Sequence, residues 1–293
     1  MARGVAALAT LAISIGSPAI ALGSPAIALG SPTLERHARF FESAGPPRAC
    51  ALLLHGLNTD PQAMDTLARE LADDGVLVLR AVLAGHEGSP GAFEEASRER
   101  WLSDAELAWR AIHARATELG LPCLAAGFSL GGLLLVDLAN GDHSIRPDGF
   151  ILFAPATRLR PGTALIRPLA ALGIAIASAA PPAYRSASVV SANAYRALFA
   201  SADAIARCPI PIGVPSLVLA DGEDPLVDAQ ALAAAATGLR ECRFVYLDCD
   251  GPAKGGRHHL MLDPATVGDA SWGILRAEIR SFVDRVISGN DAR

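Results

Sequence analysis

The segment from Leu124 to Gly132 contains the residues best suited to covalent chemistry. It reads Leu-Ala-Ala-Gly-Phe-Ser-Leu-Gly-Gly, which places a serine in the pattern G-x-S-x-G. The residues before the serine predict a strand and those after it predict an apolar helix, the context that holds such a serine in a sharp turn. Glycines two residues before and after the serine leave room where a Cβ atom would collide with neighbouring backbone. The pattern therefore predicts that Ser129 is a nucleophile at the N-terminus of a helix whose free N–H groups face the reacting carbonyl.

A nucleophilic serine needs a base, an orienting acid and donors for an oxyanion. In this type of turn the chain order is serine, then acid, then histidine. Four acids, Asp221, Glu223, Asp224 and Asp228, follow a predicted strand, and a later glycine-rich loop delivers two histidines, His258 and His259. Residues 52–58 end the first clear strand, where a backbone N–H can supply an oxyanion donor. These segments are distant in sequence, so the fold must bring them to one edge of a sheet.

Short apolar runs alternate with longer helical periods from Ala51 onward, which predicts a parallel sheet covered by helices. This is an α/β fold. The expected strands are Ala51–Leu54, Val76–Ala81, Cys123–Gly127, Phe150–Phe153, Ser216–Ala220 and Arg243–Leu247. The expected helices are Pro61–Ala72, Arg100–Leu119, Leu130–Leu138, Leu226–Ala236 and Ala270–Val286.

Composition excludes several classes of function. The chain has 293 residues, of which 51% are hydrophobic, and a net charge of -5 without a dense basic run, so a nucleic-acid partner is not expected. Lys254 is the only lysine and does not follow glycine, so no phosphate-binding P-loop is present, and no G-x-G or H-E-x-x-H pattern occurs. Neither a cofactor nor a metal is expected, because a site built from His258, His259 and Cys249 would lack a fourth ligand. Five cysteines at wide spacing do not predict a disulfide scaffold, although a single bridge stays open.

The chain divides into three predicted parts. Residues 1–30 start with one basic residue and an apolar run and then repeat Ser-Pro-Ala-Ile-Ala-Leu-Gly, which predicts an export signal, with an uncleaved anchor as the alternative. Residues 33–157 and 213–293 form the expected catalytic core, and residues 158–212, where the alternation fails, form an expected helical cap or lid. A transmembrane span at Leu169–Pro182 is the rival interpretation, but this stretch is shorter than the roughly 20 residues that a span needs.

The chain resembles the α/β-hydrolase superfamily, and within it the branch of bacterial serine carboxylesterases and monoacylglycerol-lipase-like enzymes. The resemblance covers Ala51 to Val286. It is carried by the serine turn and by five further features, namely His55-Gly56, Gly85-His86, Trp101 with Asp104, Asp-Pro-Leu-Val from Asp224, and a late histidine. Departures from the family pattern are Ala84 in place of proline, Asp221 in place of glycine, and two adjacent histidines in place of Gly-His.

The resemblance implies a Ser129, Asp224 and His258 triad with the Leu57 and Leu130 N–H groups as the oxyanion hole. His258 is preferred over His259 because the family histidine commonly precedes an acid by five residues, as His258 precedes Asp263. His55, His86 and Trp101 are expected to be structural, Asp104 to lie on a helix surface or anchor a loop, and Asp221, Glu223 and Asp228 to be solvated.

The expected function is hydrolysis of carboxylic esters with a hydrophobic acyl group through an acyl-enzyme. A serine peptidase, amidase or acyltransferase on the same fold stays open, as does a non-catalytic binding protein. The expected partner is a small ester or lipid-like substrate, with peripheral membrane contact through the cap left open. An exported, periplasmic or secreted location follows from the leader, and the resemblance indicates a bacterial source. The sequence does not determine the oligomeric state, the acyl length or the site of leader cleavage.

Overall fold

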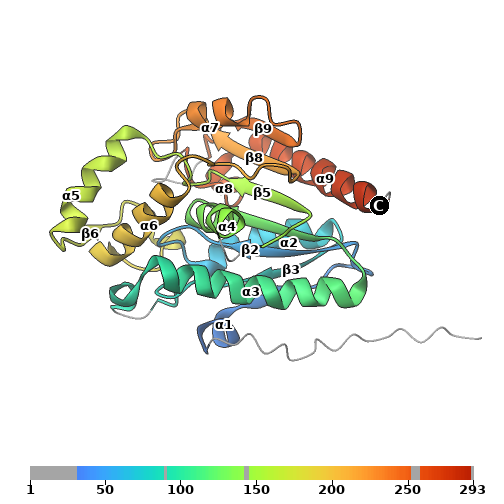
Figure 1. Ribbon diagram of the computed structural model, residues 1–293, viewed down its shortest axis with the longest axis horizontal. Helices are drawn as coiled ribbons and strands as arrows, with labels where there is room; N and C mark the ends of the chain where they lie inside the picture. Colours follow the sequence, from blue (N-terminus) through green and yellow to red (C-terminus); the bar gives the residue numbers. More distant parts are fainter. Residues whose placement is uncertain (1–31, 89–90, 142–144, 252–257, 292–293) are drawn as a thin grey trace, which may run out of the picture.

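A seven-stranded sheet forms the centre of the molecule, with the strand order β1-β3-β2-β4-β5-β8-β9 (Figure 1). The computed structural model describes residues 32–88, 91–141, 145–251 and 258–291, so the predicted leader 1–30 lies outside the described residues. The six predicted strands are confirmed and run parallel. The strands of the sheet are β1 (Arg39–Phe41), β2 (Ala49–Leu54), β3 (Val76–Arg80), β4 (Cys123–Phe128), β5 (Gly149–Phe153), β8 (Ser216–Asp221) and β9 (Cys242–Leu247).

Helices cover both faces of this sheet (Figure 1). Helices α3 (Arg98–Leu119) and α4 (Leu130–Asn140) pack on one face, and α2 (Asp65–Asp73) and α9 (Asp269–Asp291) pack on the other. The shorter elements of the core are α1 (Pro32–His37), η1 (Pro61–Met64), η2 (Ala92–Glu95), α7 (Ala229–Ala236) and α8 (Pro264–Val267). The expected helix Pro61–Ala72 is therefore a 3₁₀ turn followed by an α-helix.

Strand β2 shows how the sheet divides two apolar cores. Its residues are Ala-Cys-Ala-Leu-Leu-Leu, all fully buried. Because successive side chains point to opposite faces, Cys50, Leu52 and Leu54 join the core under α3 and α4, whereas Leu53 joins the core under α2 and α9. Each fully buried leucine contributes roughly 1.5–3 kcal/mol of transfer free energy. Continuous apolar runs of this kind are what a parallel strand covered on both faces requires.

The sequence did not predict β1. This strand has three residues, lies antiparallel to β3 at the edge of the sheet and pairs Arg39 with Arg80. It has one arginine and two phenylalanines, which is too short a run for hydrophobic periodicity to give a signal.

Residues 158–212 connect β5 to β8 and contain several short elements. They are η3 (Pro161–Leu165), α5 (Ile166–Ala171), β6 (Ile176–Ala177), η4 (Pro182–Tyr184), β7 (Val189–Val190) and α6 (Ala192–Ala204). Helix α6 packs against α4 and α5, and α5 and β6 lie at the left end of the molecule in Figure 1. Among the described residues, no helix combines the length and apolarity needed to cross a bilayer.

Candidate active site

Ser129 lies in a strained turn between β4 and α4, as its sequence pattern predicts. Its backbone has φ 49° and ψ −109°, an arrangement that a residue with a side chain adopts only when its surroundings enforce it. The Ser129 N–H donates to the Phe153 carbonyl at 2.9 Å, and the Ser129 carbonyl accepts from the N–H groups of Leu133 and Ala156 at 3.0 Å. The turn is thus held by β5 and by the first turn of α4.

The glycines on either side of Ser129 allow the strand and the helix to approach closely. A Cβ atom at Gly127 would lie 2.6 Å from the backbone of Gly131 and Gly132. A Cβ atom at Gly131 would collide with the backbone of Leu54. Both contacts are with backbone, which cannot move aside, so the G-x-S-x-G spacing is a steric requirement of this turn.

His259 connects the serine to a buried acid. Its Nε2 lies 3.1 Å from Ser129 Oγ and its Nδ1 lies 2.7 Å from Asp224 Oδ2. Asp224 is fully buried, and its other oxygen accepts from the N–H groups of Leu226 and Val227 at 2.8 and 2.9 Å. The carboxylate is therefore satisfied on both oxygens, which offsets the cost of burying its charge. These three side chains form a continuous chain of contacts.

The structure does not bring His258 to Ser129. The His258 Nδ1 instead lies 2.9 Å from Asp221 Oδ2, and its Nε2 lies 3.3 Å from Glu223. The backbone of His258 has φ 64°, in the left-handed region, and its side chain contacts other partners than that of His259. Of the two adjacent histidines, the alternative His259 thus occupies the place expected for His258.

Asp221 is also not the solvated loop acid that the sequence suggested. It is 2% exposed, and its side chain contacts two loops. One oxygen accepts from the Glu223 N–H at 2.7 Å, and the other accepts from the Cys249 N–H at 2.6 Å and contacts His258. Asp221 therefore joins residues 221–228, called the acid loop below, to the loop that carries both histidines.

The two expected oxyanion donors flank the serine. Leu130 is the first residue of α4, where backbone N–H groups have no intrahelical acceptor. Leu57 follows β2 and lines the same cavity as Ser129. The loop that carries it, residues 55–60, is called the oxyanion loop below.

Two buried histidines support the oxyanion loop, as expected of structural residues. His55 Nε2 accepts from the Leu83 N–H and His86 Nε2 accepts from the Asn58 N–H, both at 3.0 Å. The two rings are tilted by 55° to each other, with centroids 4.4 Å apart. Burial lowers the pKa of His55 to about 4 and also lowers the pKa of His86 well below its usual value. Both rings are neutral with the proton on Nδ1, because each Nε2 must accept.

Asp104 and Trp101 anchor the neighbouring loop. The Ala84 N–H donates to Asp104 Oδ2 at 2.8 Å, and Trp101 Nε1 donates to the Ala84 carbonyl at 2.9 Å. Asp104 is 6% exposed, and this burial raises its pKa. Of the two roles left open for Asp104, the structure shows loop anchoring.

Two contacts near the site were not anticipated from the sequence. Arg160 donates from Nε and Nη2 to the carbonyls of Asp224 and Gly222. The Tyr184 hydroxyl donates to Asp263 Oδ2 at 2.9 Å, four residues beyond His259. Both residues belong to the 158–212 segment, and no local pattern signals such long-range partners.

An apolar cavity of about 460 Å³ opens beside Ser129. Its walls come from the oxyanion loop, the acid loop and the 158–212 segment. The apolar side chains from the 158–212 segment are Leu159, Ile166, Ile176, Val190, Leu198 and Phe199. Among the described residues that line it, His259 is the one titratable side chain apart from two tyrosines. A cavity of this size and polarity suits a small apolar ligand.

Comparisons with known proteins show which family and which fold the chain is similar to. Residues 45–189 match the family described as serine aminopeptidase, S33. No curated protein sequence matches significantly. Among solved structures, a soluble variant of monoglyceride lipase from Saccharomyces cerevisiae with a substrate analog superposes with TM-score 0.71 at 14% identity, covering 85% of this chain and 91% of that one. The chain therefore has the α/β-hydrolase fold, and residues 45–189 are similar to the serine aminopeptidase family.

Two further solved structures show the same hydrolase fold. A monoacylglycerol lipase from Paleococcus ferrophilus gives a TM-score of 0.63 at 19% identity, covering 86% of this chain and 98% of that one. The protein Est1E from Butyrivibrio proteoclasticus, with ferulic acid bound, gives 0.60 at 19% identity, covering 86% and 95%. The chain thus spans nearly the whole length of structures that share its fold.

The neutral histidine pair makes stability depend on pH. His55 has a folded pKa of about 4 against 6.5 when unfolded, so between these values the unfolded chain binds the proton and the folded chain does not. We expect the free energy of unfolding to be highest above pH 6.5 and to fall by about 3 kcal/mol toward pH 4 from His55 alone. Urea unfolding at pH 7, 6 and 5 measures the slope.

A matched pair of variants identifies the source of that slope. His55→Gln should flatten it, whereas His113→Gln, at an exposed position of α3, should leave it unchanged. An identical slope in His55→Gln and the parent would contradict the assignment.

Proposed function

We propose that this protein is a serine hydrolase that cleaves carboxylic esters with a hydrophobic acyl group through an acyl-enzyme intermediate. The observation that carries the proposal is the contact chain from Ser129 Oγ to His259 to Asp224 at the wall of an apolar cavity. In this proposal the base is His259 rather than His258.

The first half of the reaction forms the acyl-enzyme. Ser129 Oγ attacks the ester carbonyl carbon while His259 Nε2 takes the hydroxyl proton. The carbonyl oxygen becomes an oxyanion that accepts from the N–H groups of Leu57 and Leu130, an interaction typically worth several kcal/mol. Asp224 holds the imidazole orientation and stabilises its positive charge. The bond to the alcohol oxygen then breaks, and His259 returns the proton to that oxygen.

The second half releases the acid. His259 removes a proton from a water molecule, and the resulting nucleophile attacks the acyl carbon. The oxyanion forms again at the same donors. The bond to Ser129 Oγ breaks, Oγ recovers its proton from His259, and the carboxylic acid leaves.

The cavity lining favours an ester over the substrate of an aminopeptidase. A peptide substrate of that kind presents a charged ammonium close to the scissile bond. Among the described residues that line the cavity there is no Asp or Glu to pair with it, and burying an unpaired charge is costly. A peptidase, amidase or acyltransferase remains the alternative activity, which a panel of ester and amide substrates separates.

We also propose that residues 158–212 form a lid that contacts a lipid surface. Its surface carries Leu165 and Leu172, 75% and 76% exposed, with Leu169 and Ile174 at 40% and 44%. The segment contains six arginines and one aspartate, a formal charge of +5 in a chain of -5. Exposed apolar side chains beside basic ones suit the interface of an anionic bilayer.

Export is the location that we propose, on the basis of residues 1–30. Their apolar run and small-residue cleavage patterns are typical of a secretory signal. A lipid-like ester outside the cytoplasm would then be the substrate available to the enzyme.

The proposed triad is tested with matched asparagine variants of the two histidines. Asparagine tolerates the left-handed backbone of His258, so both variants should fold. His259→Asn should lose at least about a thousandfold in kcat on p-nitrophenyl butyrate, whereas His258→Asn should stay within about tenfold of the parent. Intact-mass detection of a fluorophosphonate adduct should show one label on the parent and none on Ser129→Ala.

Two outcomes would contradict this proposal. Equal losses in both histidine variants would remove the distinction between His259 and His258. A folded parent that takes no label would favour a non-catalytic binding protein.

Acyl preference follows from the apolar cavity. Each buried methylene gains about 0.8 kcal/mol, so kcat/KM should rise roughly fourfold per methylene from acetate upward until the cavity is full. Leu198→Trp, which fills part of the cavity, should shift the optimum to shorter acyl chains. Ile212→Trp, at an exposed position outside the cavity lining, should not shift it. A flat profile across the p-nitrophenyl ester series would count against a hydrophobic acyl site.

Lipid contact is tested by sedimentation with vesicles. The protein without residues 1–30 should bind phosphatidylglycerol vesicles more than phosphatidylcholine vesicles, and less so as salt rises. The double variant Leu165→Gln, Leu172→Gln should lose most of this binding, and Ile274→Gln on α9, also exposed, should keep it. Equal binding by both variants would refute contact through Leu165 and Leu172, which flank α5.

A further inference from the structure

Asn58 occupies an unusual position beside the oxyanion loop donor. It directly follows Leu57, and its backbone has φ 55°, in the left-handed region. It is 4% exposed and lines the same cavity as Ser129. A buried amide side chain must find hydrogen-bond partners, so its contacts report what it holds.

Those contacts lead to the 158–212 segment. Asn58 Nδ2 donates to the Ala187 carbonyl at 2.9 Å, and Asn58 Oδ1 accepts from the Ala187 N–H at 2.9 Å. The Asn58 carbonyl accepts from the Ser186 N–H at 3.0 Å. The side chain thus mimics one step of a β-ladder against residues 184–187, which we call the strap.

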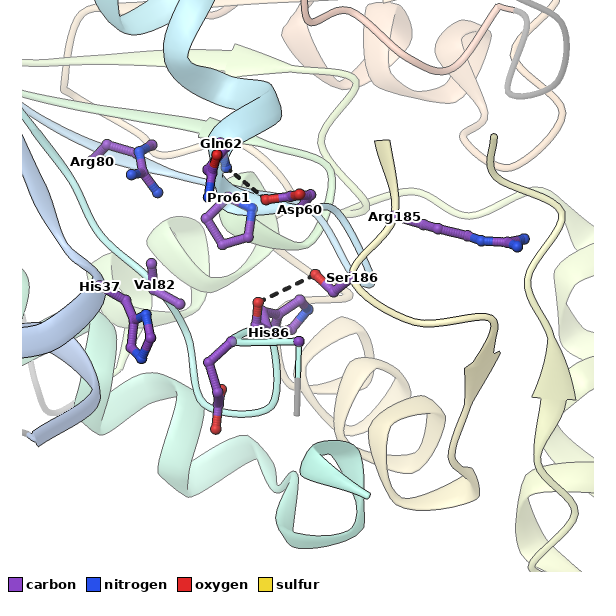
Figure 2. Close-up of a pocket in the computed structure, with 11 residues that line it drawn as sticks. His37, Asp60, Pro61, Gln62, Arg80, Val82, His86, Arg185 and Ser186 are labelled. Carbon is purple, nitrogen blue, oxygen red and sulfur yellow. Dashed lines mark hydrogen bonds between the residues drawn. The ribbon is translucent and has the colours of Figure 1, made fainter. Parts of the chain in front are cut away.

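The next residues of the oxyanion loop continue this pairing antiparallel to the strap. Thr59 forms an antiparallel bridge with Arg185, and the Asp60 N–H donates to the Tyr184 carbonyl at 3.0 Å. The Ser186 hydroxyl donates to the Thr59 carbonyl at 3.0 Å and lies 3.3 Å from the His86 carbonyl (Figure 2). The strap also reaches the histidine loop, through Tyr184 and Asp263.

Two cavities adjoin the oxyanion loop and the residues that follow it. The apolar cavity of about 460 Å³ adjoins residues 57–59. A polar cavity of about 180 Å³ adjoins residues 60–62, with His86 and the strap residues Arg185 and Ser186 on its other walls (Figure 2). Hydrogen bonds to the strap and to His86 therefore restrain a buried loop that borders both cavities.

We propose that Asn58 is a positioning residue, whose paired hydrogen bonds to Ala187 hold the Leu57 N–H in place to bind the oxyanion. This inference rests on the proposed ester hydrolysis. It means that the lid segment contributes to catalysis, because the oxyanion hole is complete only while the strap is docked.

Three substitutions separate the tether from the backbone conformation. Asn58→Gly keeps a residue that adopts φ 55° readily but removes both side-chain hydrogen bonds. Asn58→Asp keeps the size and the acceptor but cannot donate to the Ala187 carbonyl. Asn140→Asp is the matched control, because Asn140 Nδ2 donates to the Cys208 carbonyl of the same segment at 2.8 Å, far from the oxyanion loop.

Steady-state kinetics and a transition-state analogue measure the effect. We expect Asn58→Gly and Asn58→Asp to lower kcat about 10- to 100-fold with KM within about threefold, since a displaced oxyanion donor acts only on the transition state. The inhibition constant of a trifluoromethyl ketone, which would form an oxyanion adduct with Ser129, should rise by a similar factor. Asn140→Asp should match the parent in both.

Hydrogen–deuterium exchange provides a readout that does not depend on activity. Faster exchange in residues 55–62 and 184–190 of both Asn58 variants, but not of Asn140→Asp, is expected. If the parent proves inactive on esters while this exchange pattern holds, the proposed function fails but the tether stands.

The inference is overturned by any of three results. Parent-like kcat in Asn58→Gly would reduce Asn58 to a residue that merely tolerates the turn. Unchanged exchange in both peptides would show that the strap does not hold the loop. Equal losses in Asn58→Asp and Asn140→Asp would indicate general destabilisation.

Discussion

Ser129 adopts a backbone conformation that costs roughly 1–3 kcal/mol wherever a non-glycine residue is held in it, and the surrounding structure has to enforce that conformation. The enforcement comes from β5, through the Phe153 carbonyl, and from the first turn of α4. It also depends on two glycines that let α4 approach the backbone of β2 and β4. The parallel register of β2, β4 and β5 therefore places the serine hydroxyl at the carboxyl edge of the sheet, on the same side as the loops that carry Asp224 and His259.

The other half of the site depends on two buried histidines that stay neutral. His55 and His86 accept backbone N–H donors, and Asp104 anchors the loop between β3 and α3. Protonation of either ring at Nε2 would turn that nitrogen into a donor facing the backbone N–H that now donates to it. The burial that lowers both pKa values thus preserves the geometry of the oxyanion loop, and the same burial makes that geometry sensitive to acid.

The 158–212 segment links these halves. Arg160 binds carbonyls of the acid loop, the strap pairs with the oxyanion loop, and Tyr184 contacts the loop of His259. The same segment carries exposed leucines, and six of its seven charged residues are arginines. Elements of this segment are therefore hydrogen-bonded to the loops that carry Leu57, Asp224 and His259.

The sequence by itself determined the six parallel strands and the turn at Ser129, because apolar periodicity and glycine spacing are local properties. Only the tertiary structure shows that His259 contacts Ser129 and that His258 contacts Asp221, since adjacent residues share one sequence context. Asp221 looked solvated because its partners Cys249 and His258 come from another loop. The tether of Asn58 joins residues 129 positions apart. Hydrogen bonds of that kind are set by how the chain folds back on itself, and no local pattern encodes them.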